Sequence, residues 1–109
     1  MKVVIAGGRH FVFSKEDFDR LDRLHAEHGF TEVFSGGAPG ADMVGEFWAK
    51  RNGLPVKLFP ADWENEGNSA GPIRNRQMAI ECDAVILFPG GRGTENMRQM
   101  AIRYGRPLL

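Results

Sequence analysis

Four glycine-rich segments of this chain carry side chains that could hold an anion or move a proton. In chain order they contain Gly7, Gly8 and Arg9; Ser35, Gly36, Gly37, Gly40 and Asp42; Asp62 and Trp63; and Gly90, Gly91, Gly93 and Thr94. Glycine permits positive φ and removes the side chain that would keep a ligand away from peptide N–H groups. Exposed amides at helix N-termini bind phosphate well. The segments therefore predict contacts to a phosphate-bearing small molecule.

Two groups of polar residues point to phosphate contacts in particular. The Thr94 hydroxyl and the amides of Gly91 and Gly93 could hold a phosphate, and Thr94 could at the same time be a helix N-cap; the phosphate contact is the favoured interpretation. Arg74, followed by Asn75, could pair bidentately with phosphate or stabilise a leaving group. The alternative for Arg74 is a solvated surface residue.

The acidic side chains are candidates for ribose binding or catalysis. Asp62 could bind ribose or act as a general base, or it could form a local turn. Glu95 could be a catalytic acid, or it could stabilise the first turn of a helix. Asp42 suits a ribose hydroxyl, but a structural role at a helix start is the favoured interpretation. Arg74, Glu95 and Asp62 form the candidate catalytic set.

Two further residues keep two interpretations each. Trp63 could stack on a base, or it could be buried and pin its loop. Arg9 could clamp the ligand, or it could form a salt bridge with Asp42 or Asp62.

The elements that must position these residues are strands alternating with helices. Short apolar runs predict strands near residues 3–6, 33–35, 56–59, 84–88 and 107–109, and periodic stretches between them predict four helices. This order predicts an α/β fold: a single domain over residues 1–109, with an open parallel sheet of about five strands and helices on both faces. Parallel strands end at one edge, so the four segments should converge on one crevice.

Local signals place the helix boundaries. Ser14 and Asp17 have the spacing of a capping box, and Gly29 fits just past the end of that helix. Pro72 fits the first position of the third helix. Residues 60–71 show no regular pattern, which predicts a functional loop.

Composition excludes several classes of protein. Lys plus Arg and Asp plus Glu are 14 each, so the net charge is zero, which makes a nucleic-acid partner unlikely and is compatible with a homodimer. The single cysteine, Cys82, and the lack of a leader or an apolar span predict a cytoplasmic protein without a membrane partner. His25 and His28 lack a third metal ligand, so neither a metal nor a cofactor is expected.

The segment from Pro89 to Thr94 resembles the Pro-Gly-Gly-x-Gly-Thr signature of the SLOG superfamily. That superfamily includes the LOG phosphoribohydrolases, which activate cytokinins, and the DNA-processing protein DprA. The glycine motifs at residues 7–9 and 36–42, together with the Pro-Ala-Asp-Trp and Ala-Gly-Pro-x-Arg-Asn motifs, resemble the small YspA-like branch. The resemblance implies a Rossmann-like fold, a nucleotide-derived ligand and dimers formed through helices, with the helix carrying Met97 and Met100 as a contributor.

The resemblance also frames the alternatives. LOG enzymes use an arginine in an Arg-Lys-x-x-Met segment, which Arg74 and Met78 match, and a glutamate three residues after the signature threonine. Met97 occupies that glutamate position, and the acid lies instead at Glu95. The main hypothesis is therefore binding, sensing or processing of a nucleotide-like molecule. A LOG-like N-glycosidic hydrolase is the first alternative, and a DprA-like single-strand binder is the second.

Overall fold

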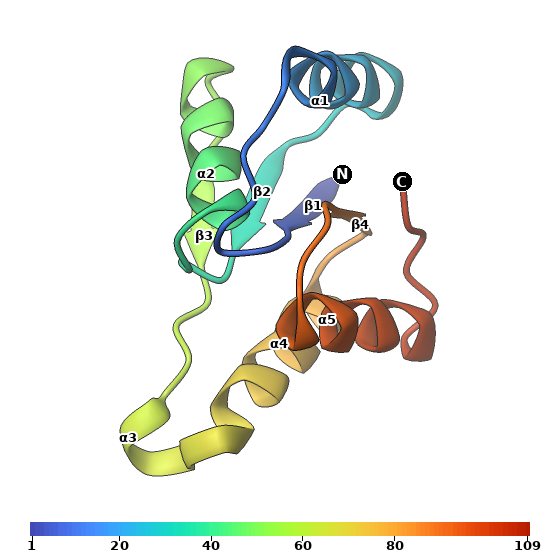
Figure 1. The fold of residues 1–109 in the computed structure, drawn as a ribbon. Helices are drawn as coiled ribbons and strands as arrows, with labels where there is room; N and C mark the ends of the chain where they lie inside the picture. Colours follow the sequence, from blue (N-terminus) through green and yellow to red (C-terminus); the bar gives the residue numbers. More distant parts are fainter.

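The computed structural model describes residues 1–109 and consists of a four-stranded parallel sheet with helices on both faces (Figure 1). The elements are β1 (Lys2–Ala6), α1 (Lys15–His28), β2 (Glu32–Ser35), α2 (Ala41–Arg51), β3 (Val56–Leu58), α3 (Trp63–Glu66), the 3-10 helix η1 (Gly67–Ser69), α4 (Ala70–Glu81), β4 (Ala84–Leu87) and α5 (Arg92–Arg103). The predicted α/β class is confirmed.

The order of the strands creates a switch point in the middle of the sheet. The spatial order is β3-β2-β1-β4, so β1 pairs on one side with β2 and on the other with β4. The chain winds outward from β1 to β3 and then crosses back to place β4 beside β1. Open α/β sheets bind their ligands beyond the carboxyl ends of the strands at such a point.

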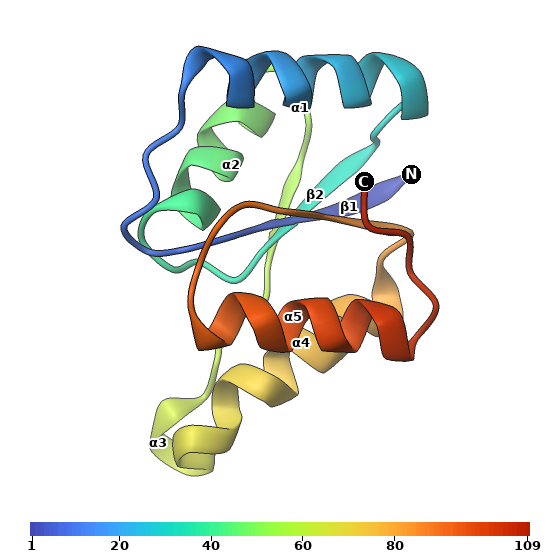
Figure 2. The same ribbon diagram turned by 45° about the vertical axis from the view of Figure 1, so that its right-hand side comes forward.

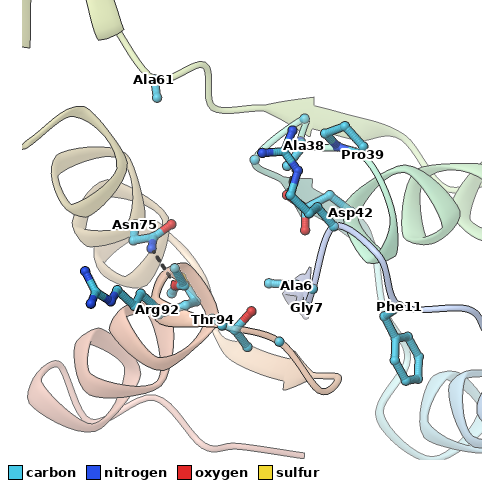
Figure 3. A pocket seen from close by; sticks show the side chains of 18 of the residues that line it. Ala6, Gly7, Phe11, Ala38, Pro39, Asp42, Ala61, Asn75, Arg92 and Thr94 are labelled. Carbon is cyan, nitrogen blue, oxygen red and sulfur yellow. Dashed lines mark hydrogen bonds between the residues drawn. The ribbon is translucent and has the colours of Figure 1, made fainter. Parts of the chain in front are cut away.

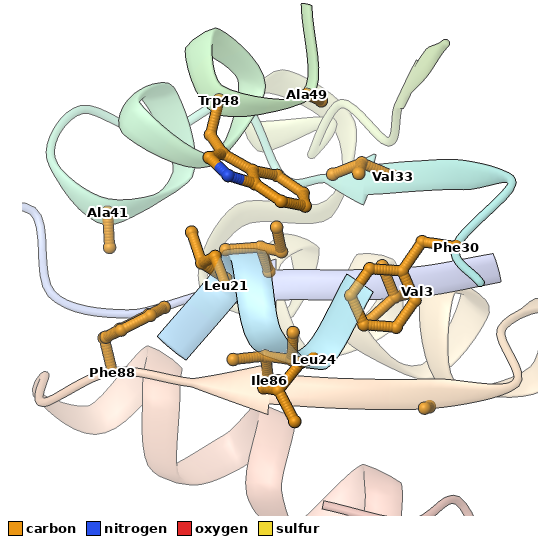
Figure 4. Packing of buried hydrophobic residues seen from close by; sticks show 12 residues of the cluster. Val3, Leu21, Leu24, Phe30, Val33, Ala41, Trp48, Ala49, Ile86 and Phe88 are labelled. Atoms are coloured by element: carbon orange, nitrogen blue, oxygen red, sulfur yellow. The ribbon is translucent and has the colours of Figure 1, made fainter. Parts of the chain in front are cut away.

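Each face of the sheet contributes to a separate hydrophobic cluster. Val3 and Ile5 belong to the cluster that contains Leu21 of α1 and Trp48 of α2 (Figure 4). Val4 and Ala6 alternate to the other face, where α4 and α5 cover them (Figure 2). Burial on both faces explains why the strands read as continuous apolar runs.

Local interactions define the ends of α1. The Ser14 hydroxyl accepts a hydrogen bond from the Asp17 amide, and the Asp17 carboxylate accepts one from the Ser14 amide at 2.8 Å. Gly29 adopts a left-handed conformation just beyond the last helical residue. Both the predicted capping box and the predicted stop are present.

Two predicted elements differ in the structure. The expected fifth strand is a single bridge between Val85 and Leu108, because only one residue of the C-terminal segment pairs with β4. Residues 60–71 are not an irregular loop, since α3 and η1 occupy them and α4 begins at Ala70 rather than Pro72. The Asp62 carboxylate caps α3, which allows a helix to form at residue 63. Pro72 is tolerated as the third residue of α4, because the amides of the first helical turn have no partner within the helix.

The length of the helices and the burial of two methionines on α5 can be compared with the expectations for membrane and dimer contacts. None of them combines the length and the apolarity needed to cross a membrane. The Met97 side chain packs inside the second cluster, with Met100 partly buried against it. The expected contribution of α5 to a homodimer stays a prediction.

Candidate functional site

A cavity of about 940 Å³ opens at the carboxyl edge of the sheet, and all four glycine-rich segments contribute to its wall. In Figure 3, Asn75, Arg92 and Thr94 lie on one side, Ala38, Pro39 and Asp42 lie on the other, and Ala6 and Gly7 lie between them. The predicted residues that line it are Gly7, Gly8, Arg9, Gly36, Gly37, Asp42, Trp63, Arg74, Asn75, Gly90, Gly91, Gly93 and Thr94. Their role as ligand contacts stays a prediction.

Two members of the candidate catalytic set lie outside this wall. The Asp62 carboxylate accepts from the Asn65 amide and, at 2.9 Å, from the Asn65 side chain, so it caps α3. Glu95 is exposed and pairs along α5 with Arg98 at 3.3 Å and with Gln99. For both residues the observed contacts are those of the structural alternative.

Ser35 and Gly40, two residues predicted to contact the ligand, also lie outside the cavity wall and interact with other parts of the protein. The buried Ser35 hydroxyl donates to Glu46 at 2.7 Å and accepts from the Gly37 amide at 3.0 Å. Gly40 precedes α2 with φ near +80°, and a Cβ there would lie 2.4 Å from the backbone of Arg9. Both residues therefore shape their loop, and neither reaches the cavity wall.

Arg74 braces the loop that follows β2. Its guanidinium donates to the Gly36 carbonyl at 2.7 Å, to the Phe59 carbonyl at 3.4 Å and to the Asn75 side chain at 2.9 Å. It is half-buried, and this burial lowers its pKa while the nearby Asp42 opposes the change. A half-buried arginine with a carboxylate nearby stays protonated at neutral pH. Arg74 is thus not the solvated surface residue of the alternative interpretation, and most of its donors are already in use.

Asp42 is the one carboxylate in the cavity wall. It is buried in the first turn of α2 and accepts from the Ala38 amide at 3.3 Å. Burial raises its pKa above the ordinary value, against the opposing effects of the Ala38 amide, the Arg74 guanidinium and the Gly7 amide. The carboxylate therefore ties together the loops after β1 and β2.

Asn75 joins α4 to the start of α5. Its side-chain amide donates to the Gly93 carbonyl at 3.2 Å and to the Asn96 side chain at 3.0 Å, and its oxygen accepts from Arg74. The residue is buried, so these bonds replace contacts with water. Asn75 fixes the position of the α5 N-terminus relative to Arg74.

The glycines of the site serve different purposes. Gly8 donates to the Pro89 carbonyl at 2.8 Å, and a Cβ on Gly90 would lie 2.6 Å from the Gly8 nitrogen. These two glycines allow the loops after β1 and β4 to touch. By contrast, a Cβ on Gly91 or Gly93 would meet nothing within 4 Å, and neither residue has positive φ.

Gly91 and Gly93 are alone among the 14 glycines in having both ordinary φ and open space for a side chain. The fold itself gives no reason for glycine at either position, and both line the cavity. At the second position of α5, glycine is even unfavourable compared with alanine.

Unpaired amides surround these glycines. The backbone N–H groups of Gly91, Arg92, Gly93 and Thr94 donate to no atom of the protein. Gly91 is the N-cap, which makes Thr94 the third helical residue, so the N-cap interpretation of Thr94 is wrong. The positive end of the α5 dipole adds to the attraction that these amides exert on an anion.

The structural alternatives for Arg9 and Trp63, a salt bridge and a buried ring, are both wrong. Arg9 forms no salt bridge with Asp42, Asp62 or any other acid. Trp63 is exposed rather than buried and so does not pin its segment. Both side chains belong to the cavity wall.

Sequence reasoning missed part of the wall. The unassigned lining residues are Ala6, Phe11, Ala38, Pro39, Ala61, Met78, Pro89, Arg92 and Met97. Arg92 carried a usable signal, because it stands between two glycines of the phosphate motif. Met78 and Met97 carried none, since their spacing only marks them as helical core. No cluster of three or more metal-ligating side chains occurs anywhere in the chain.

A comparison of the sequence with models of known protein families identifies the family to which the chain belongs. The sequence model of the YspA, cpYpsA-related SLOG family matches residues 1–65. The chain belongs to this SLOG family. A relative from Mycobacterium phage D29, the Gene 61 protein, is 35% identical over 117 aligned residues, which cover 99% of this chain and 94% of that protein.

A solved structure supports the fold of this SLOG protein along almost its whole length. The X-ray structure of TM1055 aligns with a TM-score of 0.74 and 25% sequence identity, covering 98% of this chain and 71% of that chain. The Rossmann-like fold expected from the sequence is thereby confirmed.

Proposed function

We propose that the protein binds a nucleotide or nucleotide-derived small molecule in the cavity at the switch point, with a phosphate on the N-terminus of α5. The observation that carries this proposal is the pair Gly91 and Gly93, whose missing side chains leave open space that the fold does not use. A phosphate would fill that space and accept from the free amides of residues 91–94.

The remainder of the wall suits the same class of ligand. Its volume lies near the upper end of the roughly 300–1,000 Å³ typical of small-molecule sites. Arg9, Arg74 and Arg92 line the cavity together with a single carboxylate, Asp42, so cationic groups predominate. The membership of the SLOG family supports a nucleotide-related ligand at the level of the fold.

The LOG-like hydrolase remains the alternative for the same cavity. It needs an acid or base near the scissile bond, and the two carboxylates first considered, Asp62 and Glu95, lie outside the wall. Asp42 is the acid that the cavity does contain, but amides and Arg74 already engage it. The geometry therefore favours binding over turnover.

The experiment pairs ligand binding with product detection. Wild-type protein, Gly91→Asp, Gly91→Ala and the control Gln99→Glu are titrated with AMP, ADP-ribose and NAD, following the thermal shift and any released base. Gln99 is exposed on the same helix and outside the cavity, so its substitution adds a charge away from the site; it also removes the hydrogen bond to Glu95, which lies outside the cavity as well.

We expect a ligand-dependent shift for wild type and Gln99→Glu, a smaller one for Gly91→Ala, and none for Gly91→Asp, because a carboxylate would occupy and repel the phosphate position. Released base would favour the hydrolase. An unchanged shift in Gly91→Asp would place the phosphate elsewhere, and no shift with any ligand would refute the proposal.

A further inference from the structure

One side of the cavity carries an exposed tryptophan. Trp63 is 59% exposed at the start of α3, whereas the chain's other tryptophan, Trp48, is 3% exposed and donates its indole N–H to Asp22 at 2.8 Å. Tryptophan is highly buried on average, because its ring offers a large apolar surface. A ring left open to water at the wall of a ligand cavity is well placed to contact the ligand.

The surroundings of Trp63 keep its ring near the cavity. A Cβ on Gly71 would lie 3.3 Å from Cη2 of the indole, so the absence of a side chain there lets the ring approach the first turn of α4. The same first turn leads to Arg74, which donates to the Gly36 carbonyl, and to Asn75, which donates to the Gly93 carbonyl in the proposed phosphate loop, residues 89–94. The cavity thus extends from Trp63 to residues 91–94 without interruption.

The segment that holds Trp63 is weakly attached to the rest of the protein. No residue of 60–69 belongs to either hydrophobic cluster. Its hydrogen bonds are local, such as Glu66 to Asp62, Gly67 to Trp63 and Ala70 to Gly67. Figures 1 and 2 both show α3 projecting beyond the layer formed by α4 and α5. The segment can therefore adjust its position at low cost.

We propose that Trp63 stacks on the base of the bound nucleotide, so that the site selects nucleotides over sugar phosphates. This inference rests on the proposed function, because it needs a phosphate held at residues 91–94. Aromatic stacking suits any planar base, since every base offers a π-face. The phosphate loop would then provide affinity for the class, and Trp63 would provide the preference for a base.

The test compares two probes that share the phosphate and the ribose. Dissociation constants for AMP and ribose 5-phosphate are measured by calorimetry for wild type, Trp63→Ala, Trp63→Phe and the control Phe47→Ala. Phe47 is 63% exposed on α2 and outside the cavity, so it controls for the loss of an exposed aromatic ring. Circular dichroism confirms that each variant is folded.

We expect Trp63→Ala to weaken AMP binding by about tenfold or more and to leave ribose 5-phosphate unchanged. Trp63→Phe should retain part of the preference, and Phe47→Ala should retain all of it. AMP should also reduce acrylamide quenching of wild-type fluorescence, because stacking shields the exposed indole, and should have no such effect in Trp63→Phe.

Different outcomes separate this inference from the function it rests on. If wild type binds neither probe, the proposed function itself fails. If wild type binds AMP and Trp63→Ala binds it equally well, or loses affinity for both probes to the same degree, the stacking role is overturned while phosphate binding stands. AMP binding that leaves the quenching of wild type unchanged would also overturn it.

Discussion

At the scale of single residues, Asp42 and Arg74 show how one pair organises the loops of the cavity. A Cβ on Gly36 would lie 2.5 Å from the Arg74 guanidinium and 2.9 Å from the Asp42 carboxylate, so the loop after β2 passes between the two side chains. Each group neutralises part of the cost of burying the other. Asp42 and Arg74 therefore fix the position of the loop after β2, and any effect of the pair on a ligand is indirect.

The raised pKa of Asp42 leads to a prediction for stability. Its folded-state pKa lies above its unfolded value of about 3.9, so the folded state binds the proton more tightly. The resulting contribution to the free energy of unfolding is fully present below about pH 4 and is lost as pH rises through the folded-state pKa. Urea unfolding at several pH values should show wild type losing stability relative to Asp42→Asn across this window.

The Glu64→Gln variant provides the control for that experiment, because Glu64 is exposed and its side chain forms no hydrogen bond or ion pair. Its stability profile should run parallel to that of wild type. A constant difference between wild type and Asp42→Asn at every pH would contradict the predicted linkage.

At the scale of elements, the cavity depends on how α4 meets α5. Both helices cover the same face of the sheet, and at the N-terminus of α5 Asn75 makes the polar contact between them through the Gly93 carbonyl and the Asn96 side chain. A hydrogen-bonded residue here holds the N-terminus of α5 in place while leaving its amides available. An apolar contact would not define the same orientation.

Replacement of Asn75 by alanine should therefore lower the free energy of unfolding by about 1–3 kcal/mol, because it removes three hydrogen bonds of a buried side chain to partly buried partners. Asn96→Ala removes a single one of these bonds and should cost less. Urea denaturation of both variants measures the difference. Equal stability of Asn75→Ala and wild type would show that water replaces the lost bonds.

At the scale of the whole molecule, charge is balanced overall but not at the cavity. The chain has 14 basic and 14 acidic residues, yet Arg9, Arg74 and Arg92 line the cavity with one carboxylate. Arg9 and Arg92 form no hydrogen bond or salt bridge with the protein through their side chains. A neutral protein can thus present a local positive field to a small anion without attracting a long polyanion.

This uneven distribution predicts a salt effect on binding. Raising NaCl from about 50 to 300 mM should weaken AMP binding through screening of the exposed charges. Arg92→Gln should weaken binding at low salt and reduce the salt dependence, whereas Arg103→Gln, at the other end of α5 and outside the cavity, should do neither. Isothermal titrations at the two salt concentrations test both statements, and identical slopes for all three proteins would contradict them.

The sequence by itself determined the order of the elements and the edge at which the polar loops meet. Apolar runs, the Ser14 capping box and Gly29 act locally, so they could be identified without knowing what packs against them. Only the tertiary structure separated Gly8 and Gly90, which touch each other, from Gly91 and Gly93, which face open space.

The same holds for the charged and aromatic side chains. Arg74 braces a loop distant in sequence, Asp62 and Glu95 are engaged by their own helices, and Trp63 stays exposed beside Gly71. A side chain's partner depends on distances between segments far apart in the chain, and residue type and spacing do not encode these distances. The place of the glycine loop after β4 was therefore predictable from its residues, whereas the roles of the residues around it were decided by packing.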